Sequence, residues 1–209
     1  MKKHLFTNLK LIFAAAALLL LMASCTSEIS LELKKDGSVD VEFSGVAGKA
    51  FAAMLDSSGT VIFDTKEIEY EMAANGFSKV KALSKNGSDL TVSLTDKDRK
   101  SALFTSKVVT VEKGKLRASL SPQSLVDFYK AADSQTVQFL DMLLAPIFNE
   151  EEMSEEEYLE LLASFYGQEI ADEMGKSSFR ITLKNPDGTE IVRNIGFAKL
   201  LCLNEVLVF

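Results

Sequence analysis

Histidine is almost absent from this chain. The only one, His4, lies near the amino terminus, and residues 25–209 contain none. That part of the chain therefore offers no Ser-His-Asp triad, no Cys-His pair and no histidine-liganded zinc site. No spacing of carboxylates or metal-ligating residues points to another catalytic centre. We expect a protein without a cofactor or metal, and not an enzyme.

Basic residues are outnumbered by acidic ones. The chain holds 23 Lys and Arg against 30 Asp and Glu, which gives a formal net charge of −7. Residues 1–24 contain three lysines and no acid, so removing those three positive charges would change −7 to −10. Nucleic-acid binding needs Lys and Arg to neutralise phosphates. The charge disfavours nucleic acid as a partner, and it disfavours adhesion of the protein surface to anionic lipid headgroups.

The amino-terminal segment has the pattern of a secretory signal. Lys2, Lys3 and Lys10 precede a run of 12 apolar residues, 11–22. A helix that spans a bilayer needs about 20 apolar residues, so this run is too short for one. Its length and its basic flank are typical of a signal peptide.

The end of this segment, Met22-Ala23-Ser24-Cys25, resembles the lipobox of bacterial lipoproteins. It departs from that pattern at Met22, where the family usually has Leu. The resemblance implies that the Cys25 thiol receives a diacylglycerol, that cleavage removes residues 1–24, and that the new amino terminus is also acylated, for example with palmitate. Two or three acyl chains hold a protein on a membrane almost permanently. The alternative is an ordinary signal peptide that leaves a free thiol, which a secreted chain seldom carries.

These patterns predict where the protein acts. We expect it in the bacterial cell envelope, anchored by lipid to a membrane and facing outside the cytoplasm. With Cys25 lipidated, Cys202 has no intramolecular partner, so we expect no disulfide framework. Cys202 lies in the apolar run 200–203, which favours a buried structural cysteine over a reactive thiol.

Residues 25–209 predict a single domain, long enough to bury a core. Apolar residues alternate on both sides of tight turns, which is the signal of β-hairpins. The predicted hairpins span 29–43, 77–94 and 109–120, a later strand at 179–183 leads into a turn at 186–188, and an apolar strand is predicted at 201–209.

Helical patterns lie between and after the hairpins. One covers 47–55, and another begins at Asp64 with a capping box and stops at Asn75-Gly76. The block 121–175 is helical, with starts at Ser121-Pro122, near 133–134, and at Ser154, where Glu157 completes a capping box. We predict an α+β fold: an antiparallel sheet built from hairpins, with a helical insertion at about residues 121–175 packed on one face.

Three charged or glycine-rich stretches are candidate sites, and each has a simpler interpretation. The segment 45–50 superficially resembles a phosphate-binding loop, but it has Phe43 where the first glycine belongs and Ala50 where Ser or Thr belongs. Six glutamates within 150–157 lack the alternation and the central glycine of a calcium loop, and suit a helix start. The run 96–99 fits an ordinary surface turn.

The most unusual stretch is 139–148, in which Asp141 is the only polar residue before Pro146. A helix that is apolar nearly all round must be buried somewhere, and a core helix is the simplest interpretation. The alternative is a lid that contacts lipid or lines an apolar pocket, with Met142 and Met153 supplying adaptable contacts. Its contact residues would be Leu143, Leu144, Ile147 and Phe148.

The hairpin 31–39 and the later segments 179–183 and 186–188 resemble small bacterial lipoproteins of unassigned function, such as the LppM-like lipoproteins of mycobacteria. The resemblance implies a lipid-anchored α+β domain and carries no catalytic residue. Our leading hypothesis is a monomeric, non-enzymatic envelope protein that binds a protein partner or an apolar ligand. A lipid-handling protein that uses helices in 133–174 is the second hypothesis, and a hydrolase that uses only carboxylates is the third.

Overall fold

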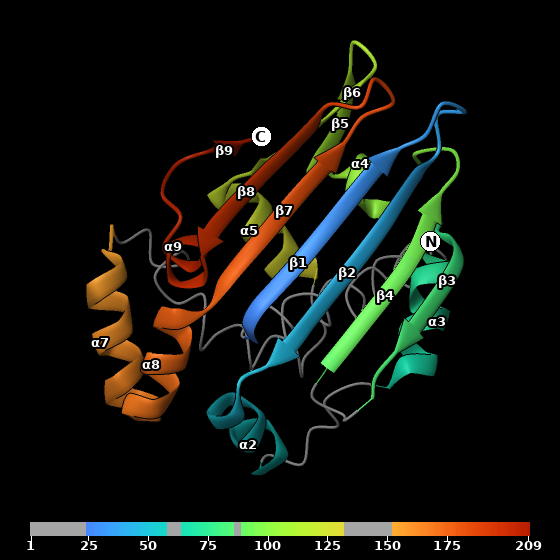
Figure 1. The fold of residues 1–209 in the computed structure, drawn as a ribbon. Coiled ribbons are helices and arrows are strands. Elements are labelled where there is room, and N and C mark those ends of the chain that lie inside the picture. The colour runs from blue at the N-terminus through green and yellow to red at the C-terminus, as the bar shows by residue number, and fades with distance from the viewer. Residues whose placement is uncertain (1–23, 58–63, 86–88, 132–151) are drawn as a thin grey trace, which may run out of the picture.

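A sheet of six strands forms the front layer of the molecule (Figure 1). The computed structural model describes residues 24–57, 64–85, 89–131 and 152–209. The order of the strands is β3-β4-β2-β1-β7-β8, so the amino-terminal hairpin supplies the two central strands. The six are β1 (Ser24–Leu33), β2 (Val39–Ala47), β3 (Ser78–Leu83), β4 (Asp89–Asp96), β7 (Ser178–Lys184) and β8 (Glu190–Gly196).

The three predicted hairpins are present. β1 pairs antiparallel with β2, β3 with β4, and residues 109–112 with 115–118. The strand predicted at 179–183 is part of β7, which turns at 185–189 and pairs antiparallel with β8. β1 and β7, however, run parallel to each other, so the sheet is mixed rather than purely antiparallel. A parallel pair needs a long crossover between its strands, and local alternation of apolar residues carries no information about it. The α+β class itself is confirmed.

One face of this sheet forms the core. Successive side chains of a strand point to opposite faces, and in β2 the side chains of Val39, Val41 and Phe43 are buried. Leu31 of β1 and Leu183 of β7 lie on the same face and are at most 2% exposed. Full burial of each such side chain contributes about 1.5–3 kcal/mol, so this face is a main source of stability.

A second layer lies behind that face (Figure 1). It contains a smaller antiparallel sheet in the order β5-β6-β9, made of β5 (Val109–Glu112), β6 (Lys115–Leu120) and β9 (Leu207–Val208). The short helix α4 (Ala102–Thr105) and helix α5 (Pro122–Ala131) lie in the same layer. β6 contacts both β1 and β7 of the large sheet, which closes the core between the layers.

Three helices begin where the sequence predicts. Asp64 caps α3 (Thr65–Ala74) by accepting hydrogen bonds from the backbone N–H groups of Lys66 and Glu67. Ser121 Oγ accepts from the backbone N–H of Ser124 at the start of α5. Ser154 and Glu157 form the full capping box of α7 (Glu155–Tyr166). Helix α2 (Lys49–Ser57) follows β2, and α8 (Gln168–Lys176) leads into β7.

The carboxyl-terminal segment differs from its prediction. Instead of one apolar strand over 201–209, the chain forms the helix α9 (Phe197–Leu201) and then only the two-residue strand β9. Phe197, Leu200 and Leu201 are at most 1% exposed. Polar Asn204 and Glu205 are exposed and interrupt the apolar run, so the segment cannot continue as one buried strand.

Candidate functional site

Cys25 lies at the very start of the central strand β1. The next residue, Thr26, is in register with Val46 of β2 on one side and with Ser178 of β7 on the other. The predicted lipid attachment point therefore joins the sheet directly, within one residue of a three-stranded pairing. Residues 1–23, which form nearly all of the predicted signal peptide, lie outside the described residues.

Two helices meet beside this end of β1. A carboxylate of α8, that of Glu173, accepts hydrogen bonds from the backbone N–H groups of Ala50 at 2.8 Å and Phe51 at 3.1 Å. Both N–H groups belong to the first turn of α2, where a helix has no acceptor of its own for them. A carboxylate there also complements the positive end of the helix dipole. Glu173 thus ties α8 to α2 across 123 residues of sequence.

Gly48 makes this contact possible. A Cβ atom built on Gly48 would overlap the Glu173 carboxylate, so only glycine lets the side chain approach the start of α2. The arrangement explains the Gly48-Lys49 pair that superficially suggests a phosphate loop. The anion position at this helix start is filled by a carboxylate of the chain itself, which agrees with the rejection of a phosphate site.

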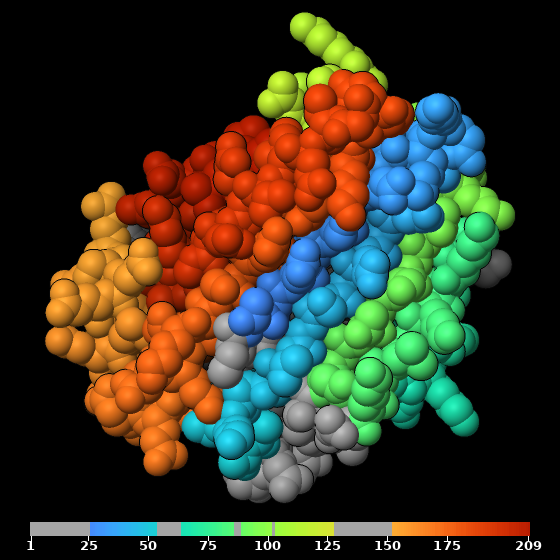
Figure 2. Space-filling model, viewed as in Figure 1, coloured from blue at the N-terminus to red at the C-terminus, as the bar shows by residue number. Residues whose placement is uncertain are grey.

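The outer face of the six-stranded sheet is not covered by any helix of the described residues. Figure 2 shows it bare across β7, β1, β2 and β4. Its side chains are those that alternate with the buried ones, and the strand register orders them in rows. One row crosses β2, β1 and β7 through Ser44, Glu28 and Arg180. A second row crosses the same strands through Asp40, Glu32 and Lys184.

Charge on this face is arranged in stripes. Glu28 and Glu32 of β1 lie beside Asp40 and Glu42 of β2, which gives an acidic centre. Cations border it on one side: Arg180 Nε lies 3.7 Å from Glu28 Oε1, and both side chains are close to half exposed. Exposed ion pairs of this kind contribute little to stability.

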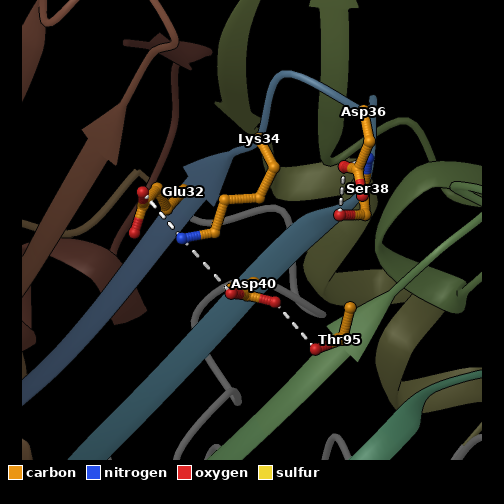
Figure 3. A network of polar contacts seen from close by, with 6 residues as sticks. All are labelled: Glu32, Lys34, Asp36, Ser38, Asp40 and Thr95. Carbon is orange, nitrogen blue, oxygen red and sulfur yellow. Dashed lines mark hydrogen bonds and ion pairs between the residues drawn. The ribbon is translucent and has the colours of Figure 1, made fainter.

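A polar network joins three strands on this face near the β1–β2 turn (Figure 3). Lys34 Nζ lies 2.7 Å from Glu32 Oε1 and 3.4 Å from Asp40 Oδ2. Asp40 in turn accepts a hydrogen bond of 2.7 Å from the Thr95 hydroxyl of β4. The hydrogen bond to Glu32, and then the bond to Asp40, raise the pKa of Lys34. The network fixes neighbouring charges on the face.

A second set of contacts lies at the same end of the sheet, opposite to Cys25. Asn185 in the β7–β8 turn is buried, and its Oδ1 accepts a 2.8 Å hydrogen bond from the backbone N–H of Leu116 in β6. Asp187 forms an ion pair with Lys115 at 2.8 Å. The ammonium of Lys115, followed by hydrogen bonds from Thr189, holds the pKa of Asp187 well below its ordinary value. These contacts join the two sheets.

The remaining predicted residues fall into three groups. Leu143, Leu144, Ile147 and Phe148 lie outside the described residues, as do the predicted helix near 133–148 and Glu150 and Glu151. Glu155, Glu156 and Glu157 occupy the first turn of α7, as expected for a helix start. Asp96 of the 96–99 run is 1% exposed and accepts hydrogen bonds from the backbone N–H groups of Lys100 and Ser101, so it stabilises a turn.

Cys202 is half-buried at the end of α9. Its Sγ lies 4.0 Å from the backbone oxygen of Ser154. Burial, and to a lesser extent the charge of Glu155, raise the pKa of the thiol to about 12. A thiol that stays protonated at neutral pH is a poor nucleophile, in line with a structural cysteine.

Residues 24–57, 64–85, 89–131 and 152–209 contain no cluster of three or more His, Cys, Asp or Glu placed to hold a metal ion. In these ranges no helix is both long enough and apolar enough to cross a membrane.

Sequence reasoning missed two parts of this arrangement. The Glu173 contact joins residues far apart in the chain, and only the unexplained glycine before Lys49 hinted at it. The acidic centre was visible as alternating Glu and Asp in 28–32 and 40–42, but the cations beside it depend on the parallel pairing of β1 with β7. Comparison with protein-family models, curated proteins and solved structures gave no match to this chain.

Proposed function

We propose that this protein is a lipid-anchored protein of the bacterial cell envelope that acts as a non-enzymatic binding module. The lipobox at 22–25 supports the anchor. The observation that carries the binding role is the open, charge-striped outer face of the six-stranded sheet, built on the same central strand that begins at the anchor.

The face favours a protein partner with charges of both signs. The acidic centre, formed by Glu28, Glu32, Asp40 and Glu42, complements a basic stripe, and the flanking cations complement acids at its border. Complementary charge across an interface sets specificity and the rate of association more than affinity. Nucleic acid is disfavoured, because the centre of the face is acidic.

Site-specific cross-linking tests the binding role. A photoreactive amino acid is placed at Ser93, which is exposed on the open face of β4, and in a matched variant at Lys113, which is exposed in the β5–β6 turn. We expect Ser93 to cross-link one defined protein in intact cells, and Lys113 not to do so. The charge reversal Glu42→Lys in the Ser93 variant should abolish the product.

Two results contradict the binding role. The first is the same product from both positions, which would mean that the open face has no specific contact. The second is a product from Ser93 that survives the reversal of Glu42, which would mean that the acidic centre plays no part in recognition.

A further inference from the structure

The anchor fixes which end of the domain lies nearest the membrane. Thr26, one residue after Cys25, is already hydrogen-bonded into the sheet between β2 and β7. A lipid on Cys25 therefore has no flexible linker between it and the folded domain. The start of β1 must lie at the bilayer surface, and the β1–β2 turn lies about 33 Å away along the ten residues of β1.

The helices α7 and α8 extend beyond the sheet at this same end. α8 ends at Lys176, two residues before Ser178 pairs with Thr26, and it contacts β1 and α2. The amino-terminal end of α7 also lies near the sheet, since Glu155 is close to Gly196 at the end of β8. Figure 1 shows the turn between α7 and α8 beyond the end of the sheet at which β1 begins.

Two aromatic side chains are exposed at that turn. Phe165 is 70% exposed and Tyr166 is 38% exposed, and their ring centroids are 6.2 Å apart. Phe165 is the most exposed large apolar side chain of the described residues. Gly167 follows with a φ of 92°, a conformation that turns the chain sharply into α8. The aromatic pair therefore forms the tip of a helical hairpin.

We propose that Phe165 and Tyr166 insert into the interfacial region of the membrane to which Cys25 is tethered. Tyr166, which has a polar hydroxyl, suits the level of the lipid headgroups, and the apolar ring of Phe165 suits the boundary between headgroups and acyl chains. The tether keeps the tip close to the bilayer, so a contact too weak to bind the free protein still forms at high effective concentration. The domain then stands on its α7–α8 end with the strands leading away from the membrane, which leaves the open sheet face accessible.

Charge limits which lipids suit this contact. Glu160 of α7 and Glu169 and Asp172 of α8 are all exposed, so the hairpin is acidic near its tip. Anionic headgroups repel such a surface. We expect the contact to form on zwitterionic phosphatidylcholine and to weaken as anionic phosphatidylglycerol is added.

Tryptophan fluorescence tests the proposal, because the sequence contains no tryptophan and any introduced one is the only reporter. F165W places the probe at the tip, and K35W places the same probe in the β1–β2 turn at the far end, where Lys35 is exposed. Each full-length variant is produced in bacteria, purified in its processed form and reconstituted into phosphatidylcholine vesicles brominated near the headgroup end of the acyl chains. Y166W serves as the tip probe if F165W fails to fold.

We expect the emission of F165W to shift to shorter wavelength and to lose most of its intensity to the brominated lipid, and the emission of K35W to change in neither respect. This proposal rests on the proposed lipid anchor. Vesicle flotation tests the anchor separately from the membrane contact, because an anchored protein floats with the vesicles whether or not its tip inserts. If both variants float and neither is quenched, the membrane contact is refuted while the anchor stands. If neither floats, the anchor itself has failed. A blue shift of F165W without quenching places a protein surface over the tip and also overturns the proposal.

Discussion

The contact between Glu173 and the start of α2 yields a quantitative prediction. Its carboxylate accepts two backbone hydrogen bonds, of 2.8 Å and 3.1 Å. Hydrogen bonds to a charged group contribute about 1.5–3 kcal/mol, and loss of a helix cap costs roughly 1 kcal/mol. Because Glu173 is half-buried, water replaces part of what is lost. We expect Glu173→Ala to lower the free energy of unfolding by about 2 kcal/mol.

Gly48→Ala should lower the free energy of unfolding by a similar amount, because it disrupts the same hydrogen bonds. The added Cβ would overlap the Glu173 carboxylate, so the carboxylate must move away and its hydrogen bonds are lost. In the Glu173→Ala background that obstacle is gone. There Gly48→Ala should be neutral, or should stabilise by about 0.4–1 kcal/mol because alanine restricts the unfolded chain. The two substitutions should therefore be coupled by about 2 kcal/mol.

Equilibrium urea unfolding of the detergent-purified protein measures this coupling, with far-ultraviolet circular dichroism as the signal. The four proteins required are the wild type, both single variants and the double variant. If Gly48→Ala destabilises equally in both backgrounds, the steric argument is refuted, because the cost then arises from something other than the carboxylate.

Four further outcomes are expected. Ser154→Ala should destabilise by about 1 kcal/mol through loss of the α7 cap, measured by the same unfolding assay. The pKa of Asp187 in the folded protein is lowered, first by Lys115, from its ordinary value of 3.8. The ionised carboxylate therefore stabilises the fold above pH 3.8, and this stabilisation is lost as the pH falls below that value. In Asp187→Asn, the free energy of unfolding should fall less steeply with pH in this acidic range. Thr182→Val should be neutral or stabilising, because Thr182 Oγ1 is buried and makes no hydrogen bond within the described residues. Thr95→Val, by contrast, should destabilise the protein, because it loses the hydrogen bond to Asp40. Cys202, with its pKa raised to about 12, should react with iodoacetamide far more slowly in the folded protein than in urea.

Local features of the fold could be predicted from the sequence because their physics is local. The capping box of Ser154 and Glu157 depends on residues three positions apart, and the β1–β2 hairpin on the alternation around Asp36-Gly37. Both are present in the structure. The lipobox is likewise a local pattern, and the described residues add to it only the position of Cys25 at the start of β1.

Features that depend on distant residues could not be predicted in this way. The parallel pairing of β1 with β7 joins residues about 150 positions apart, and it decides which cations border the acidic centre. The cap from Glu173 to α2 also has no local signal, apart from the glycine that it requires. At the carboxyl terminus, the apolar residues favoured a strand over 201–209, but only Leu207–Val208 form one, because exposed Asn204 and Glu205 interrupt the apolar run.

We propose that Cys25 is the lipid anchor that holds the domain at the membrane. Mass spectrometry of the mature amino terminus of the protein, isolated from the bacterial membrane fraction, tests it most directly. We predict a first residue Cys25 whose mass includes a thioether-linked diacylglycerol, with or without an acyl group on its amino nitrogen. A mature chain that begins at another residue, or one that begins at Cys25 with an unmodified thiol, would contradict the account.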